Sequence, residues 1–256
     1  MSNKIVVNNL NYKVNDKNIL QSASIKVKEG QFVGIIGPNG SGKTTLLKHI
    51  YRVLPVRSDT VFINGIDITK LSIRQSSKFM TVMRQENNSV FDYTNLEMVL
   101  MGRSPHKKIY ETADCKDLEI AFDSLKYVGM FDAKDRLFNT LSGGEKQRVL
   151  MARSLAQETD IFILDEPTNH LDVYYQWNLM KSIKKLNKTV LAVFHDLSIA
   201  LEYCDYLYVL NDGKNMAEGK SAEVLNKEVL KDIFKVDSEI ITTSNGKRRV
   251  LIYGSI

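Results

Sequence analysis

A glycine-rich segment carries the clearest chemistry in the chain. Residues Gly37–Thr44 read GPNGSGKT and fit the phosphate-binding pattern G-x-x-x-x-G-K-[S/T] in full. Glycines let backbone N–H groups surround a phosphate, and the start of the helical pattern that follows adds positive potential. Lys43 can contact the β- and γ-phosphates, and the Thr44 hydroxyl can bind Mg²⁺. The pattern therefore predicts a nucleoside triphosphate site.

Acidic residues and a histidine follow two further apolar runs. Asp165 ends the run IFILD and could hold Mg²⁺ through its water shell, while Glu166 could orient and deprotonate an attacking water. Alone, an Asp-Glu pair is equally consistent with a helix N-cap, and a lone histidine such as His195 is usually structural. Together with the phosphate pattern, the three residues favour hydrolysis, with His195 near the γ-phosphate on a strand beside that of Asp165.

A second helix start also suits an anion. The segment Leu141–Arg148 reads LSGGEKQR, in which Ser142 and two glycines precede a helical run. A serine hydroxyl, free backbone N–H groups and the helix dipole favour a phosphate there. One phosphate group needs only one such cradle, so two copies of the chain facing head to tail would explain both.

Apolar periodicity predicts the elements that position these residues. Short strands are expected near the N-terminus and at Phe32–Ile36, Val61–Ile63, Ile161–Leu164, Val190–Phe194 and Tyr206–Leu210. Helices are expected from Lys43 to about Val53 and near residues 174–187, 197–203 and 221–234. Residues 86–157 carry mainly helical spacing. The pattern predicts an α/β core with a mainly parallel sheet and an inserted helical subdomain.

Composition excludes several classes of protein. The 256 residues are 43% hydrophobic and 25% charged, which is typical of a globular chain and not of a disordered one. The net charge of +5 is scattered and argues against a nucleic-acid surface. Cys115 and Cys204 show no metal-ligand spacing, and no apolar run approaches the roughly 20 residues of a membrane span. We therefore expect a cytoplasmic location.

The combination of motifs resembles the ATP-binding cassette (ABC) ATPases along essentially the whole chain. Walker A corresponds to Gly37–Thr44, Walker B with its catalytic glutamate to Ile161–Glu166, and the signature motif to Leu141–Glu145. The Q-loop glutamine corresponds to Gln85, the D-loop to Asn169–Asp172 and the switch histidine to His195. The resemblance implies a P-loop NTPase core at about residues 1–85 and 158–256, an antiparallel β subdomain, and the helical subdomain at about 86–157.

The resemblance also implies roles for individual residues. It assigns catalysis to Lys43, Gln85, Glu166 and His195, and Mg²⁺ binding to Thr44, Gln85 and Asp165. It assigns ATP binding to Tyr12, Gly37, Pro38, Asn39, Gly40, Ser41, Gly42, Lys43, Thr44, Thr45, Leu141, Ser142, Gly143, Gly144, Glu145 and Asp172. Tyr12 would stack on adenine, although a tyrosine on a strand more often fills core or surface. The turn Arg57–Thr60 departs from the usual serine-glycine turn of the family.

Within the family, the sequence is similar to ATPases of importers for iron-siderophores, haem and vitamin B12. The similarity rests on MGRSPHKK at Met101–Lys108, on Leu141–Gln157 and on Glu166–Gln176. It implies a second cassette, most simply a second copy, and separate permease subunits, with a substrate-binding lipoprotein or periplasmic protein further out. The ATPase would lie on the inner face of the cell membrane and contact no nucleic acid.

Other interpretations remain open from the sequence. Haem or vitamin B12 could replace the iron-siderophore as cargo, and a soluble ABC ATPase could act on ribosomes or DNA. A non-catalytic nucleotide-binding regulator is disfavoured by intact Lys43, Asp165, Glu166 and His195. Four methionines, Met80, Met83, Met98 and Met101, could form either core or an adaptable docking surface, with core packing the favoured interpretation.

Overall fold

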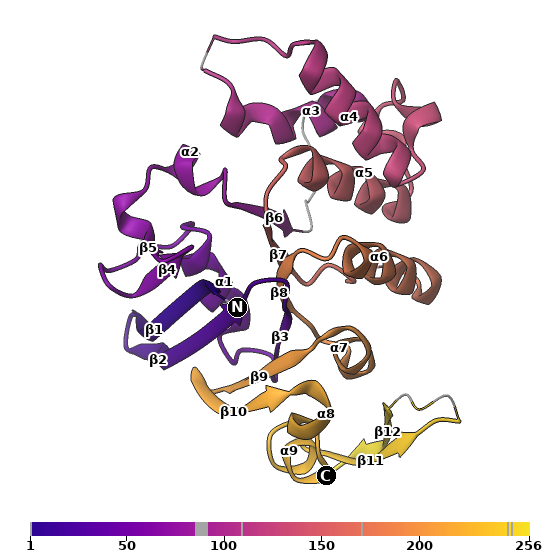
Figure 1. Ribbon diagram of the computed structural model, residues 1–256. Helices are drawn as coiled ribbons and strands as arrows, with labels where there is room; N and C mark the ends of the chain where they lie inside the picture. The colour runs from indigo at the N-terminus through magenta and orange to yellow at the C-terminus, as the bar shows by residue number, and fades with distance from the viewer. Residues whose placement is uncertain (1, 85–91, 109, 170, 245, 247) are drawn as a thin grey trace.

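A six-stranded sheet forms the centre of the computed structural model, which describes residues 2–84, 92–108, 110–169, 171–244, 246 and 248–256 (Figure 1). Its strands lie in the order β10 (Lys214–Lys220), β9 (Tyr206–Asn211), β3 (Phe32–Ile36), β8 (Thr189–Val193), β7 (Ile161–Asp165) and β6 (Met80–Arg84). β10 runs antiparallel to β9, and all other neighbours are parallel. The predicted, mainly parallel α/β sheet is confirmed.

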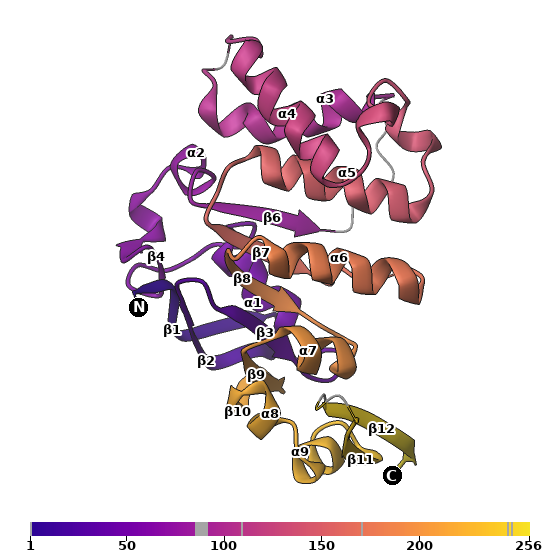
Figure 2. The same ribbon diagram turned by 45° about the vertical axis from the view of Figure 1, so that its right-hand side comes forward.

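The central strands are apolar throughout because both faces of the sheet are covered. Val33 and Ile35 of β3 pack in one cluster with α1 (Lys43–Ile50) and the N-terminal strands. Phe32 and Ile36 face the other way, toward α6 (Val173–Lys185) and α7 (Leu197–Tyr203). Figure 2 shows the sheet between these two layers. Because β3, β8 and β7 are parallel neighbours, their carboxyl ends meet at one edge of the sheet.

An antiparallel sheet covers α1 on its outer side, as the family resemblance implies. Its order is β2 (Lys17–Lys28), β1 (Asn3–Val14), β4 (Val61–Ile63) and β5 (Ile66–Asp67). The register of β1 shifts on both sides of Leu10, and Asn9 has a positive φ of 45°. These irregularities explain why the alternation of apolar residues weakens after Val7. The short helix α2 (Ile73–Ser76) follows β5.

Three helices form a unit beyond β6, at the top of Figure 1. They are α3 (Asn95–Leu100), α4 (Cys115–Tyr127) and α5 (Gly143–Ala156), which confirms the expected helical insert. Met80, Met83 and Met98 are buried, and Met101 packs against the same cluster as Met83 and Met98. The core interpretation of the methionines is therefore the correct one. Among the described residues, no helix has the length and apolar character that crossing a bilayer requires.

One glutamine fastens the end of α5 to the central sheet. Gln157, which caps α5, donates through Nε2 to the carbonyls of Ser77 (2.5 Å) and Met80 (2.9 Å) and accepts from the Thr81 hydroxyl (2.9 Å). These three partners lie at and just before the start of β6. The helix that begins at the signature motif is thus tied to the core at its opposite end.

Two boundaries differ from the sequence prediction. α1 ends at Ile50 instead of Val53, because Arg52 adopts a positive φ of 62° that a helix cannot continue through. The helix expected at 221–234 is two pieces, α8 (Ser221–Val224) and α9 (Lys227–Asp232). Asn226 separates them, because its side chain accepts a hydrogen bond from the Val229 N–H and so starts a new helix.

A C-terminal hairpin of β11 (Val236–Thr242) and β12 (Arg248–Ser255) was not predicted. It is anchored through Arg249, whose Nη1 lies 2.8 Å from Glu202 of α7. The same guanidinium lies 5.2 Å from the ring centre of Trp177 on α6. These contacts are distant in sequence, so local periodicity could not indicate them.

Buried charges hold the segment Met101–His106 against the helical unit. Arg103 Nε lies 3.0 Å from Asp117 Oδ1, and both side chains are at most 7% exposed. The guanidinium also donates to the Ala156 carbonyl, and Lys107 Nζ lies 2.5 Å from Asp117 Oδ2. Hydrogen bonds from these cations hold the pKa of the Asp117 carboxyl below its usual range, although burial opposes this. Arg103 and Lys107, two of the basic residues of Met101–Lys108, therefore point inward.

We expect Arg103→Met to destabilise the protein by about 3 kcal/mol, because it leaves the Asp117 carboxylate buried with one partner fewer. Urea denaturation followed by circular dichroism measures this. The control is Lys13→Met, which removes the exposed pair of Lys13 with Asp16 and should cost less than about 1 kcal/mol. Equal losses in both variants would contradict the role assigned to Arg103.

Candidate active site

The glycine-rich loop joins β3 to α1 at the edge where the parallel strands end. Gly42 precedes α1 with a φ of 99°, and no side chain caps the helix. A Cβ at Gly37 would lie 1.9 Å from the Leu210 carbonyl oxygen, so only glycine fits there. The first turn of α1 holds no acidic side chain. Its free N–H groups and helix dipole are therefore available to a phosphate.

Lys43 lies in a cavity of about 470 Å³ at this helix start. Its side chain is only 5% exposed, and Nζ donates to the carbonyls of Gly37 (2.8 Å) and Pro38 (2.9 Å). Burial lowers the pKa of Lys43, while the charge of Glu166 raises it. The cavity is lined by Lys17, Ile19, Asn39, Gly40, Gly42, Lys43, Thr44, Thr45, Glu166 and His195. A triphosphate would supply negative charge to pair with the buried ammonium group of Lys43.

Asp165 ends β7 beside the glycine-rich loop. The Thr44 hydroxyl donates to its Oδ1 over 3.2 Å, so the two predicted Mg²⁺ ligands are adjacent. The carboxylate is 8% exposed, and burial raises its pKa against the lowering effect of its hydrogen bonds. No ion pair found among the described residues includes Asp165. A hydroxyl oxygen beside a buried carboxylate that forms no ion pair suits Mg²⁺, so Thr44 and Asp165 fit this ion.

Glu166 and His195 form a hydrogen-bonded pair at the same edge. His195 Nε2 lies 2.6 Å from Glu166 Oε1, and Asn169 Nδ2 donates to Glu166 Oε2 over 2.5 Å. His195 follows β8, which pairs with β7 as expected. Glu166 has a positive φ of 54°, a strained conformation that the surrounding contacts must hold. A carboxylate placed in this way can accept a proton from water once one of its partners moves.

The signature segment lies outside this cavity. Ser142 caps α5 and forms a reciprocal capping box, in which Glu145 Oε2 accepts from the Ser142 N–H (2.9 Å) and hydroxyl (2.8 Å). Leu141 is buried, whereas Ser142 and Gly143 are exposed. A Cβ at Gly144 would lie 3.0 Å from the Tyr175 ring. Within one chain, Ser142–Glu145 therefore does not meet Lys43.

Comparison with known proteins matches residues 20–169 to the family described as ABC transporter. The chain is 33% identical to the iron(3+)-hydroxamate import ATP-binding protein FhuC of Bacillus subtilis, over 98% of this chain and 94% of that protein. It is 33% identical to the ferric enterobactin transport ATP-binding protein FepC of Escherichia coli, over 87% and 84%. The dimeric structure of MJ0796, a bacterial ABC transporter cassette, matches with a TM-score of 0.73 and 31% identity, over 85% of this chain and 98% of that chain.

This chain belongs to the ABC transporter family. It is an ABC ATPase, which hydrolyses ATP to drive transport. Its fold agrees, because a helical insert and an antiparallel β subdomain flank the central sheet. The structure brings Lys43, Thr44, Asp165 and Glu166 of the cassette to one edge.

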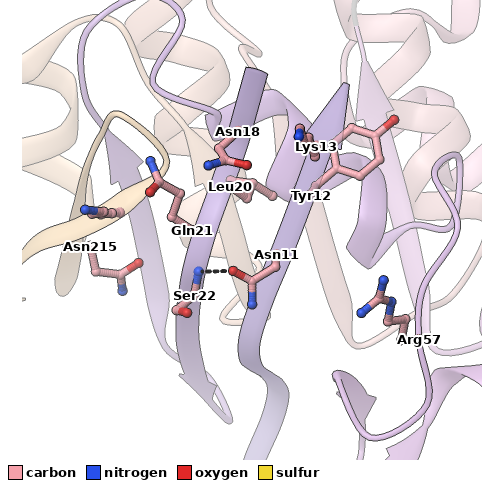
Figure 3. A pocket seen from close by; sticks show the side chains of 10 residues that line it. Asn11, Tyr12, Lys13, Asn18, Leu20, Gln21, Ser22, Arg57 and Asn215 are labelled. Atoms are coloured by element: carbon pink, nitrogen blue, oxygen red, sulfur yellow. Dashed lines mark hydrogen bonds between the residues drawn. The ribbon is translucent and has the colours of Figure 1, made fainter. Parts of the chain in front are cut away.

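Tyr12, predicted to stack on adenine, does not line the cavity that holds Lys43 in this ABC ATPase. Its half-buried ring meets His49 of α1 edge on, with ring centres 4.7 Å apart. It lines two cavities on the β1 side of the molecule and not the cavity that holds Lys43. Figure 3 shows it on β1 beside Asn11 and Lys13. In the single chain Tyr12 packs on His49, and its predicted stacking on adenine stays a prediction.

Two other predictions have different outcomes. Gln85 lies outside the described residues, so its assigned role stays a prediction. Asp172 is exposed and caps α6, accepting from the Tyr175 N–H over 3.1 Å.

Three residues near the site were not predicted from the sequence. Lys17 and Ile19 of β2 line the cavity that holds Lys43. The third is Tyr51, whose hydroxyl donates to Asp165 Oδ2. None of the three lies within a motif.

If Tyr12 serves only to pack on His49, Tyr12→Ala should lower the melting temperature and leave the affinity for ATP within about twofold. Lys43→Ala should lower ATP affinity at least tenfold, since it removes the cation from the phosphate cradle. Isothermal titration calorimetry with ATP measures both, and differential scanning calorimetry measures stability. A tenfold loss of ATP affinity in Tyr12→Ala at unchanged stability would instead support the predicted stacking on adenine.

Proposed function

We propose that this chain is the ATPase subunit of an importer for iron-siderophore complexes. The family assignment supports an ATPase that drives transport. The cargo is supported by the names of the relatives, one an iron(3+)-hydroxamate importer and one a ferric enterobactin transporter. The ATPase would act through separate permease subunits on the inner face of the cell membrane. A substrate-binding lipoprotein or periplasmic protein would deliver the cargo.

The active unit is proposed to be a head-to-tail dimer that closes around two ATP molecules. The observation that carries this is the separation of the two anion sites within one chain: Lys43 lies in the cavity, while exposed Ser142 lies on the helical unit. Ser142–Gly144 of a second copy would complete each site. The dimer in the MJ0796 structure is a precedent in a related cassette. Residues of about 86–157 would move with the permease as one subdomain.

Hydrolysis in this proposal depends on the residues that meet at the sheet edge, together with Gln85. Lys43 binds the β- and γ-phosphates, while Thr44 and Asp165, with Gln85, hold Mg²⁺, which neutralises phosphate charge. Glu166 orients the attacking water and accepts its proton. His195 and Asn169 hold both Glu166 oxygens in the single chain, so the base becomes free when closure moves one of them. Turnover is thereby linked to the closed dimer.

Two alternatives to this function have weaker support. Haem or vitamin B12 could be the cargo, because an ATPase subunit does not contact the transported molecule. A soluble ABC ATPase acting on ribosomes or DNA is disfavoured by the scattered surface charge, since nucleic-acid binding needs a basic patch.

We expect Glu166→Gln to bind ATP normally and to remain a dimer, because closure no longer leads to hydrolysis. Size-exclusion chromatography with light scattering, with and without ATP and Mg²⁺, measures the mass. The double variant Lys43→Ala/Glu166→Gln is the control and should stay monomeric. A Glu166→Gln protein that remains monomeric at saturating ATP would contradict the head-to-tail arrangement.

For the cargo, we expect cells that carry Glu166→Gln in place of the native gene to lose uptake of ⁵⁵Fe-labelled siderophore. Haem and cobalamin uptake should stay unchanged in the same cells. The control is Glu119→Gln, the same chemical change on the exposed face of α4. Normal iron uptake with loss of haem or cobalamin uptake would overturn the cargo and leave the ATPase assignment intact.

A further inference from the structure

Two hydroxyl groups hold the Asp165 carboxylate, one on each oxygen. Thr44 Oγ1 donates to Oδ1, and Tyr51 Oη donates to Oδ2, each over 3.2 Å. Thr44 lies in the first turn of α1, and Tyr51 is its C-terminal cap. A spacing of seven residues is about two helical turns, so both side chains project from the same face of α1. One helix thus orients both oxygens of the carboxylate.

The Tyr51 ring also contacts the neighbouring strand. The guanidinium of Arg84 lies 5.9 Å from the ring centre, a cation–π distance. Arg84 ends β6 and is the register partner of Asp165 on β7. Burial and the nearby Asp165 charge raise the pKa of the Tyr51 phenol, so it stays a neutral donor at physiological pH. Tyr51 therefore joins the ends of α1, β6 and β7 around one carboxylate.

We propose that Tyr51 is a positioning residue for the divalent cation of this ATPase, acting through Asp165. The inference rests on the proposed function, in which Thr44 and Asp165 hold Mg²⁺. With Oδ2 fixed by Tyr51, the plane of the carboxylate is set and Oδ1 stays beside Thr44 Oγ1. Without the phenol, Oδ2 is a buried charged oxygen that lacks this donor, and the carboxylate can rotate away. Partners that orient a metal-binding carboxylate commonly change metal affinity 10- to 100-fold.

The test compares Tyr51→Phe with its parent in a Glu166→Gln background, so that ATP binds without being consumed. Phenylalanine keeps the ring and its packing and removes only the hydroxyl. Mg²⁺ is titrated into the full-length protein with ATP while thermal stability is recorded, and Mn²⁺ binding is followed by electron paramagnetic resonance. We expect the cation concentration for half-maximal effect to rise about tenfold in Tyr51→Phe. In EDTA, the ATP concentration for half-maximal stabilisation of Tyr51→Phe should stay within about twofold of that of the parent.

The matched control is Tyr206→Phe, which removes a tyrosine hydroxyl from Glu218 Oε1, 3.4 Å away at the β9–β10 edge. Its cation half-point should equal that of the parent. In the background with intact Glu166, ATPase activity of Tyr51→Phe should recover at saturating Mg²⁺. That recovery separates weaker cation binding from a damaged fold.

Two results would overturn the positioning role of Tyr51. One is a cation half-point in Tyr51→Phe equal to that of Tyr206→Phe. The other is weaker ATP binding in EDTA together with a lower melting temperature, which indicates a purely structural residue. If the thermal stability of the parent with ATP does not depend on Mg²⁺, the result contradicts the proposed ion site at Thr44 and Asp165 itself. The parent measurement thus separates failure of the proposed function from failure of this inference.

Discussion

The buried carboxylate of Asp165 is the constraint on which the rest of the site depends. Asp165 is only 8% exposed, and a charged carboxylate in such a position is costly unless its neighbours hydrogen-bond it or a cation compensates it. Thr44 and Tyr51 supply the hydrogen bonds, and both belong to α1 or its cap. The glycine-rich loop must therefore end where β7 ends. The parallel pairing of β3, β8 and β7 provides this, because it brings their carboxyl ends to one edge.

The two helix starts predicted to bind anions differ in how far side chains already satisfy their N–H groups. At α1, no side chain caps the helix, and Lys43 turns onto loop carbonyls that a triphosphate could replace. At α5, the Ser142–Glu145 capping box already satisfies the helix start while leaving the serine exposed. The N–H groups at the start of α1 are thus open to a ligand. The start of α5 is already capped and exposes Ser142 on the surface, where a second copy could contact it. This asymmetry is what a head-to-tail pairing of cassettes requires.

The connection between the helical unit and the sheet is also polar and specific. Gln157 fastens the end of α5 to the start of β6, and β6 ends at Arg84, over the Tyr51 ring. Arg103 and Asp117 keep the segment after α3 in place within the unit. Directional contacts of this kind fix orientation in a way that apolar packing alone does not. A shift of the helical unit would therefore reach the carboxylate edge through β6.

The glycine-rich loop, the family and the order of the main elements could be predicted from the sequence, because these follow from motifs, local backbone geometry and periodicity. The same patterns placed Asp165 and Glu166 at the end of a buried strand. The largest errors of the prediction, the missing hairpin β11–β12 and the single helix at 221–234, lie where distant contacts or one capping residue decide the structure. Only the tertiary structure placed Tyr12 on His49, turned Arg103 inward and brought Tyr51 to Asp165. These contacts join residues far apart in the chain, and no local pattern encodes which side chains meet across a folded core.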